Sequence, residues 1–188
     1  MKKSNVLLFA LFLGGAMGIY GCSGKNSETD GEGTGAINID ADEKASPLRS
    51  EEGKIGDIEV KIQYGSPSVK NRVIWGDLLP YNEVWRTGAN EATFVEFSDD
   101  VIVEGKALTA GKYSLFTVPK ENGPWTVIFN TEWDLDHGHY QYREENDALR
   151  VEVDPQWEEE IHESLSITIE NSGLLIAWEK LRLPIQVQ

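Results

Sequence analysis

A short polar block in the middle of the chain carries the residue types best suited to binding a small molecule. Arg86, Asn90 and Glu91 bring a guanidinium, an amide and a carboxylate close together in the sequence. Gly88 and Ala89, which lie between them, keep the backbone of this stretch accessible. Because a guanidinium presents a planar fork of donors, arginine suits the recognition of a carboxylate or a phosphate. The block therefore predicts a site for a polar ligand with an anionic group.

Aromatic residues precede and accompany this block. Trp75, Tyr81 and Trp85 could supply a stacking face for a sugar or a peptide. A structural interpretation is equally open. In that case Arg86 and Glu91 pair to hold a long loop against the domain, and the aromatic rings belong to the core.

A second cluster has residue types that bind metals. Asp134, Asp136, His137 and His139 fall within one short stretch. A calcium loop starting at Asp134 requires glycine at its sixth position, where His139 stands instead. The two histidines could ligate zinc or a heavier metal, but the only other histidine, His162, is distant in the sequence. We expect a solvated polar loop and no bound cofactor.

The sequence gives little support for catalysis. Its single cysteine, Cys22, is assigned to lipidation below and so is no nucleophile. The chain contains neither a Gly-x-Ser-x-Gly elbow nor a glycine loop that cradles phosphates. We therefore leave catalysis open and prefer a non-catalytic protein.

The N-terminal segment has the pattern of an export signal. Lys2 and Lys3 precede an almost wholly apolar run over residues 6–17, which is too short to span a bilayer comfortably. The run leads to Gly21-Cys22, which resembles a lipobox with cysteine just after the cut. We expect residues 1–21 to be a lipoprotein signal peptide. Acyl chains on Cys22 would then anchor a bacterial envelope lipoprotein to the outer membrane, facing the periplasm or the cell surface.

Residues 22–52 are predicted to be a flexible acidic tether. They are rich in glycine, serine and acidic residues and lack apolar periodicity. The whole chain has a formal net charge of −15, and such an acidic protein repels phosphate backbones. We therefore exclude nucleic acid as a partner and expect the lipid on Cys22 to make the only membrane contact.

The remaining residues, 53–188, predict a single all-β domain. Alternating apolar residues mark many short strands separated by turns, the first over residues 57–64. This pattern favours an antiparallel β-sandwich, with a barrel-like arrangement as the alternative. Residues 165–169 and 174–178 predict a hairpin, and residues 156–162 either a helical turn or a strand extension. Tyr113, which follows Gly111, is expected to form a tyrosine corner.

The stretch from Tyr64 to Pro155 resembles the bacterial domain of unknown function 2911 family. The resemblance rests mainly on the block Val84-Trp-Arg-Thr-Gly-Ala-Asn-Glu-Ala-Thr93, with support from residues 110–116 and 125–130. It implies a secreted or lipid-anchored β-protein to which no activity is assigned. In the family an aromatic residue more often precedes the glycine at position 138. A site built on His137 would therefore be particular to this chain.

Three functions remain open at this point. The first is a non-catalytic binding or accessory module that recognises a small polar ligand, a glycan or a peptide near Arg86. The second is a metal-dependent or hydrolase-like enzyme that uses the same region or His137 and His139. The third is a purely structural envelope component, which predicts a fully buried Arg86–Glu91 pair. No particular protein partner is indicated.

Overall fold

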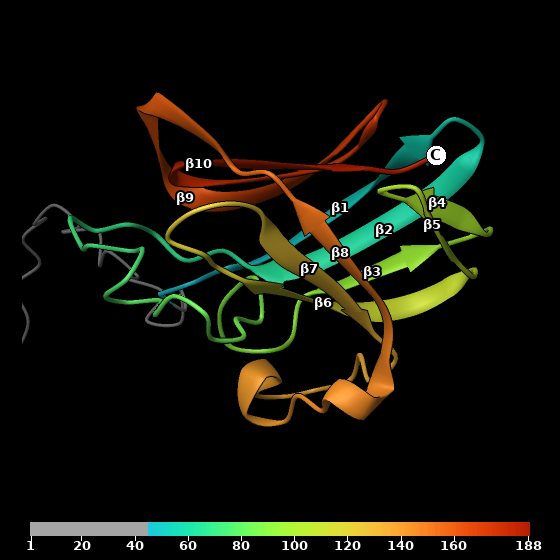
Figure 1. The fold of residues 1–188 in the computed structure, drawn as a ribbon, viewed down its shortest axis with the longest axis horizontal. Coiled ribbons are helices and arrows are strands. Elements are labelled where there is room, and N and C mark those ends of the chain that lie inside the picture. The colour runs from blue at the N-terminus through green and yellow to red at the C-terminus, as the bar shows by residue number, and fades with distance from the viewer. Residues whose placement is uncertain (1–44) are drawn as a thin grey trace, which may run out of the picture. The chain divides into compact units, whose positions relative to one another are not determined.

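The fold is known from a computed structural model, which describes residues 45–188 as an all-β protein. Six strands form one antiparallel sheet in the order β1-β2-β3-β6-β7-β8 (Figure 1). Pairings such as Ile62 with Val95 and Leu115 with Phe129 fix its register. The strands are β1 (Leu48–Ile55), β2 (Ile58–Gly65), β3 (Phe94–Phe97), β6 (Gly111–Val118), β7 (Trp125–Asn130) and β8 (Asp147–Val153).

A second layer covers one face of this sheet. Its main part is the antiparallel hairpin of β9 (Gln156–Glu170) and β10 (Gly173–Gln186), coloured orange to red in Figure 1. The short strands β4 (Val101–Val103) and β5 (Lys106–Leu108) pair with each other, and a bridge from Val103 to Val187 joins them to the end of the chain. The predicted antiparallel β-sandwich is confirmed, and the barrel-like alternative is not adopted.

Alternation along the strands builds the main core between the two layers. In β2, Val60, Ile62 and Tyr64 are buried and face the hairpin, while the residues between them are more exposed. From the opposite layer Trp178 and Leu181 meet them. Burial of apolar side chains on this scale is the main stabilising contribution to such a domain.

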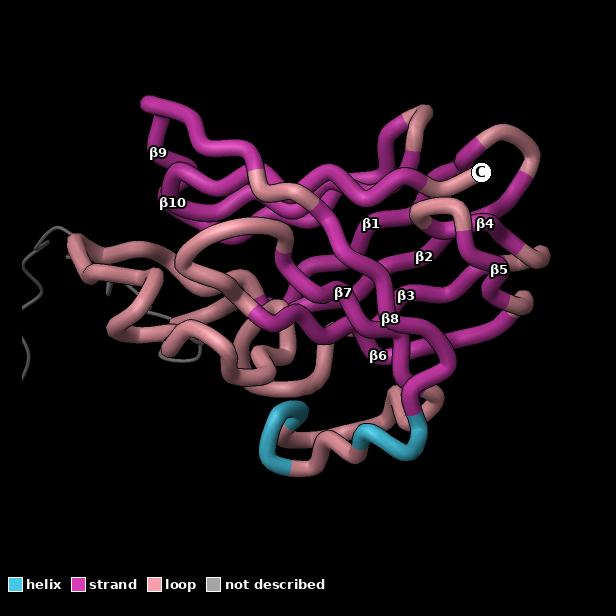
Figure 2. The backbone as a smooth tube through the Cα atoms, in the orientation of Figure 1, coloured by secondary structure: helices cyan, strands magenta, loops and turns pink. Residues whose placement is uncertain are grey.

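Strands β6 and β7 are buried on both faces. Their inner residues belong to the main core, but Phe116, Val118 and Ile128 form a separate small core on the outer face. The segments 80–92 and 131–146 cover this outer core, to which they contribute Val84, Leu135 and Tyr142. Figure 2 shows that segment 131–146 is mostly loop with two short helical turns, the 3₁₀ turns Gly138–Tyr140 and Glu144–Asn146. These two covering segments hold the candidate functional residues.

Three local predictions are decided by the structure. The Tyr113 hydroxyl lies 2.9 Å from the Thr109 carbonyl oxygen, to which it donates a hydrogen bond, so the tyrosine corner is confirmed. Residues 156–162 extend strand β9 and do not form a helical turn. The hairpin is confirmed, but both of its strands are longer than expected, and β10 continues past Pro184 with irregular register near Glu179.

The first strand also differs from expectation. Residues 48–52, which the sequence places in the tether, form most of β1 and pair with β2. The segment is polar because β1 lies at the edge of the sheet and most of its side chains are exposed. Its strand conformation comes from backbone pairing and not from an apolar pattern. No helix among residues 45–188 is long and apolar enough to cross a membrane.

Candidate functional site

Strand alternation directs Arg86 to the outer face of the large sheet. The Trp85 N–H donates to the Thr117 carbonyl at 2.8 Å, and the Thr117 N–H donates back to the Trp85 carbonyl at 2.9 Å. Residue 85 therefore pairs with β6 as a strand residue does. Because successive side chains on a strand point to opposite faces, Trp85 enters the main core, whereas Val84 and Arg86 point outwards.

The backbone that follows Arg86 is tightly folded against the end of β2. A Cβ atom at Gly88 would lie 2.6 Å from Thr93 Oγ1, so this close approach requires glycine. Thr87 has a φ of 51°, a left-handed conformation that is rare for a β-branched residue. Its hydroxyl donates to Thr117 Oγ1 at 3.2 Å, and its carbonyl accepts from Thr93 Oγ1 at 2.9 Å. These bonds hold a conformation of the kind that costs about 1–3 kcal/mol and clusters at functional sites.

The two polar clusters that the sequence predicts meet at one cleft. A hollow of about 590 Å³ is lined from one side by Arg86, Asn90 and Glu91, and from the other by the 131–146 segment. The lining residues from that segment are Asp136, His137 and Tyr140, and Ala45 completes the wall. We call this hollow the polar cleft. It joins residues of the family block to the Asp-His stretch, which the sequence treats as separate candidates.

The polar cleft combines one half-buried cation with exposed polar groups. Arg86 is partly buried, whereas Asn90, Glu91 and His137 are exposed and Tyr140 is 81% exposed. Partial burial lowers the pKa of the Arg86 guanidinium, while Tyr140 and Glu91 act in the opposite direction. Arginine nevertheless stays protonated at neutral pH, so the cleft keeps a fixed positive charge. Glu91 is exposed and does not form the fully buried pair that a purely structural role predicts.

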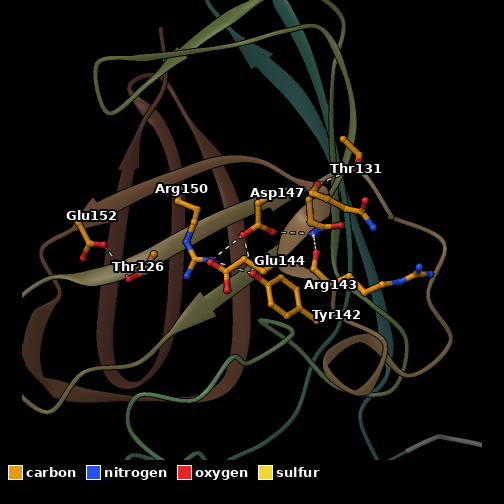
Figure 3. A network of polar contacts seen from close by, with 10 residues as sticks. Thr126, Thr131, Tyr142, Arg143, Glu144, Asp147, Arg150 and Glu152 are labelled. Carbon is orange, nitrogen blue, oxygen red and sulfur yellow. Dashed lines mark hydrogen bonds and ion pairs between the residues drawn. The ribbon is translucent and has the colours of Figure 1, made fainter.

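A polar network holds the 131–146 segment in place (Figure 3). Asp147 is its centre, with a carboxylate that is only 6% exposed. It accepts hydrogen bonds from Asn130 Nδ2 at 2.8 Å, from the Tyr142 hydroxyl at 2.7 Å and from Arg150 Nη1 at 2.9 Å. Asn130 Nδ2 also donates to the Arg143 carbonyl at 2.8 Å. The network thus fixes both ends of the segment that presents Asp136, His137 and Tyr140 to the cleft.

The predicted aromatic residues lie elsewhere. Trp85 is buried in the core, and Trp75 is partly buried within a cluster of five tryptophans. Its ring centroid is 4.9 Å from that of Trp125 and 6.0 Å from that of Trp85. Tyr81 is partly buried beside Gly76. These rings pack against the protein and are not among the residues that line the polar cleft.

The residues predicted to bind a metal do not all line the same cleft. Asp136 and His137 line the polar cleft, whereas Asp134 lines a neighbouring cleft. Across the described part of the chain, no three or more histidine, cysteine or acidic side chains gather as a metal site requires. The side chain of His139 lies outside the described part of the structure, as does Cys22.

Several cleft residues were missed at the level of the sequence. Tyr140 follows the Asp-His stretch directly, but an isolated exposed tyrosine carries no signal of its own. Gly138 allows segment 131–146 to approach Arg86. The need for a glycine there becomes evident only when this segment and segment 80–92 are placed together in the structure. The glycine between two histidines is the only local hint of such an approach.

The fold and the cleft define a class: a β-sandwich protein with a polar cleft on the outer face of its larger sheet, where two loops meet. The chain matches the family described as protein of unknown function (DUF2911) over residues 46–187. It belongs to this family, as the resemblance over residues 64–155 predicts. No curated protein and no solved structure matches the chain.

Proposed function

We propose that this protein is a non-catalytic binding module that recognises a small polar ligand with an anionic group in the polar cleft. One observation carries the proposal. Two stretches that are separate in sequence converge on the same hollow, and each contributes polar side chains to it. The strained backbone at Thr87 and the polar network around Asp147 show that the cleft walls are held in a defined arrangement.

The lining sets the chemistry of the ligand. The Arg86 guanidinium matches a carboxylate or a phosphate group. Glu91 and Asp136, when ionised, can only accept hydrogen bonds, so they match ligand hydroxyl or N–H donors. A ligand that carries an anionic group beside several donors satisfies both sides of the cleft. A small peptide and an acidic sugar both meet this description.

We further propose that the protein works at the bacterial envelope. The pattern that ends at Cys22 supports a signal peptide over residues 1–21 and lipidation of Cys22. Two or more acyl chains would give stable anchoring to the outer membrane. Metabolic labelling with a palmitate analogue tests this: the wild-type protein should be labelled and Cys22→Ala should not. An unlabelled wild-type protein would contradict the anchor but not the cleft.

The binding proposal is tested by thermal shift on the full chain, kept in solution by a mild detergent. The probes are succinate, inorganic phosphate, glucuronate and triglycine. A ligand that binds the folded state raises the melting temperature by mass action. We expect at least one probe to do so, and the shift to disappear in Arg86→Ala. Arg49→Ala, which removes an exposed arginine from the edge strand β1, should leave the shift intact.

Probe-dependent shifts, together with the stability of Arg86→Ala without ligand, separate the remaining functions. A binding role predicts little change in the free energy of unfolding. A purely structural ion pair between Arg86 and the exposed Glu91 predicts a small loss, of at most about 1 kcal/mol, and no probe-dependent shift in the wild-type protein. A shift produced only by a divalent metal, and lost in His137→Ala, would overturn the proposal in favour of a metal-dependent enzyme.

A further inference from the structure

A second cleft adjoins the polar cleft. It encloses about 260 Å³. Both clefts are lined by Glu91 and Asp136, so these two residues stand at the junction between them. We call the second hollow the apolar cleft. The name refers to one half of its lining, formed by Leu48, Ala92, Phe94, Trp133 and Leu135. The other half is polar and consists of Gln63, Glu91, Lys112, Asp134 and Asp136.

Two aromatic rings form one wall of the apolar cleft. The rings of Phe94 and Trp133 meet edge to face, with centroids 6.2 Å apart. The Lys112 ammonium lies over both of them, 3.6 Å from the Phe94 centroid and 3.7 Å from the Trp133 centroid. Attraction between the cation and the two ring faces stabilises this arrangement. Leu48 from β1 is 54% exposed and Trp133 is 39% exposed, so apolar surface remains open to an occupant.

We propose that the two clefts form one site for the C-terminal end of a peptide. The terminal carboxylate binds Arg86 in the polar cleft, and an apolar side chain of the peptide lies in the apolar cleft against Leu48 and Trp133. Peptide N–H groups donate to Glu91 and Asp136 at the junction. This inference rests on the proposed binding function and adds to it the class of ligand and a second subsite.

The lining favours a peptide over a glycan. Sugars that stack on tryptophan need an open ring face, and Lys112 occupies one face of the Trp133 ring. The aliphatic side chains of Leu48, Ala92 and Leu135 line the same cleft, and sugar hydroxyl groups that contact them lose hydrogen bonds to water, which is unfavourable. Only hydroxyl groups that reach Gln63 or the acidic residues of the lining would regain a partner. An aliphatic side chain loses only its contact with water there, which is favourable. A peptide C-terminus also supplies the anionic group and the N–H donors in one short chain.

Titration calorimetry on the full chain in mild detergent tests the inference. The probes are the tripeptides Gly-Gly-Leu and Gly-Gly-Gly, the C-terminally amidated Gly-Gly-Leu, and trigalacturonate. Burial of a leucine side chain corresponds to about tenfold or more in affinity. We therefore expect Gly-Gly-Leu to bind at least about tenfold more tightly than Gly-Gly-Gly. Amidation, like Arg86→Ala, should abolish binding.

Matched variants locate the apolar subsite. Leu48→Asn should remove the preference for Gly-Gly-Leu and leave the affinity for Gly-Gly-Gly unchanged, because Leu48 does not line the polar cleft and the substitution adds no charge. Ile102→Asn is the control, since Ile102 is 42% exposed on β4 and lines neither of the two clefts.

The other outcomes separate this inference from the function on which it rests. Equal, Arg86-dependent binding of both free tripeptides would overturn the apolar subsite and leave the binding module standing. Tighter binding of trigalacturonate than of either tripeptide, lost in Trp133→Ala, would replace the peptide by a glycan. If none of the anionic probes binds, in calorimetry or in the thermal-shift test, both proposals are overturned.

Discussion

Gly138 lies directly against the side chain of Arg86. A Cβ atom at position 138 would come within 2.7 Å of Arg86 Cβ and 2.9 Å of Arg86 Cδ. The contact joins the 131–146 segment to the family block at the polar cleft, which both segments line. The spacing between the two cleft walls therefore depends on a residue without a side chain.

Gly138→Ala is expected to disturb this contact. The added methyl group must displace either the 131–146 segment or the aliphatic part of Arg86, and overpacking of this kind costs about 1–3 kcal/mol. The positive φ of 27° at this position adds backbone strain. We expect a lower free energy of unfolding in urea and weaker binding of any ligand whose binding depends on Arg86.

Gly105→Ala separates the steric effect from backbone strain. Gly105 also has a positive φ, 78°, but a Cβ atom there would meet nothing within 4 Å. The Gly105→Ala variant should therefore lose only the free energy of unfolding that alanine costs at a positive φ, and it should bind ligand as the wild-type protein does. Equal effects of the two substitutions would show that the contact with Arg86 has no influence of its own.

Asp147→Ala should loosen the 131–146 segment. The substitution leaves Asn130, Tyr142 and Arg150 without a shared acceptor. Partly buried groups that lose a hydrogen-bond partner cost about 1–3 kcal/mol. We expect a loss of stability in that range, together with faster amide hydrogen exchange across the segment. Asp154→Ala, which removes an exposed carboxylate just after the same strand, is the control and should change neither quantity.

Much of the fold could be predicted from the sequence because its signals are local. The alternation in β2 and the Gly111–Tyr113 pattern each follow from neighbouring residues, and both are confirmed. Strand β1 was missed because its own sequence is polar, and its extended conformation depends on backbone pairing with β2. Residues 156–162 were ambiguous for a related reason: their charged side chains are mostly exposed, and the pairing with β10 decides their conformation.

The site was predictable only in its parts. Arg86, Asn90 and Glu91 stand out by residue type, and so do Asp136 and His137. These residues converge on one cleft because two loops pack over an outer core. No local sequence pattern predicts that packing. The orientation of Trp85 was equally hidden, since its burial follows from a single backbone bridge to Thr117.

Stability should fall at alkaline pH in a way that depends on Tyr142. Burial, followed by the hydrogen bond to Asp147, raises the pKa of the Tyr142 hydroxyl above its usual value of about 10. The unfolded chain therefore loses this proton first, and folding stability decreases as the pH rises above about 10. Below that pH the contribution of the protonated phenol is fully present.

Urea unfolding of Tyr142→Phe across this pH range checks the assignment. The variant should lose about 1–3 kcal/mol at neutral pH, because the hydrogen bond to Asp147 and the one from Arg150 are both removed. Its stability should fall less steeply above pH ~10. Tyr81→Phe removes a hydroxyl that lies outside the Asp147 network and should follow the wild-type curve. Parallel alkaline slopes for the wild-type protein and Tyr142→Phe would assign the pH dependence to other groups.

Lys112→Met tests whether the cation holds the wall of the apolar cleft. Methionine keeps an unbranched stem but removes the charge that lies over Phe94 and Trp133. Cation–π contacts contribute about 0.5–2 kcal/mol, according to how far they are desolvated, so the free energy of unfolding should fall by a similar amount.

Lys112→Arg should retain most of the stability, because a guanidinium also stacks on aromatic rings. Lys61→Met removes an exposed ion pair with Glu52 and should leave the free energy of unfolding nearly unchanged, because solvent screens such a pair. If Lys112→Met were as stable as Lys112→Arg, the wall would be held by ring packing alone, and the near-ultraviolet circular dichroism of the aromatic side chains should then be unchanged in both variants.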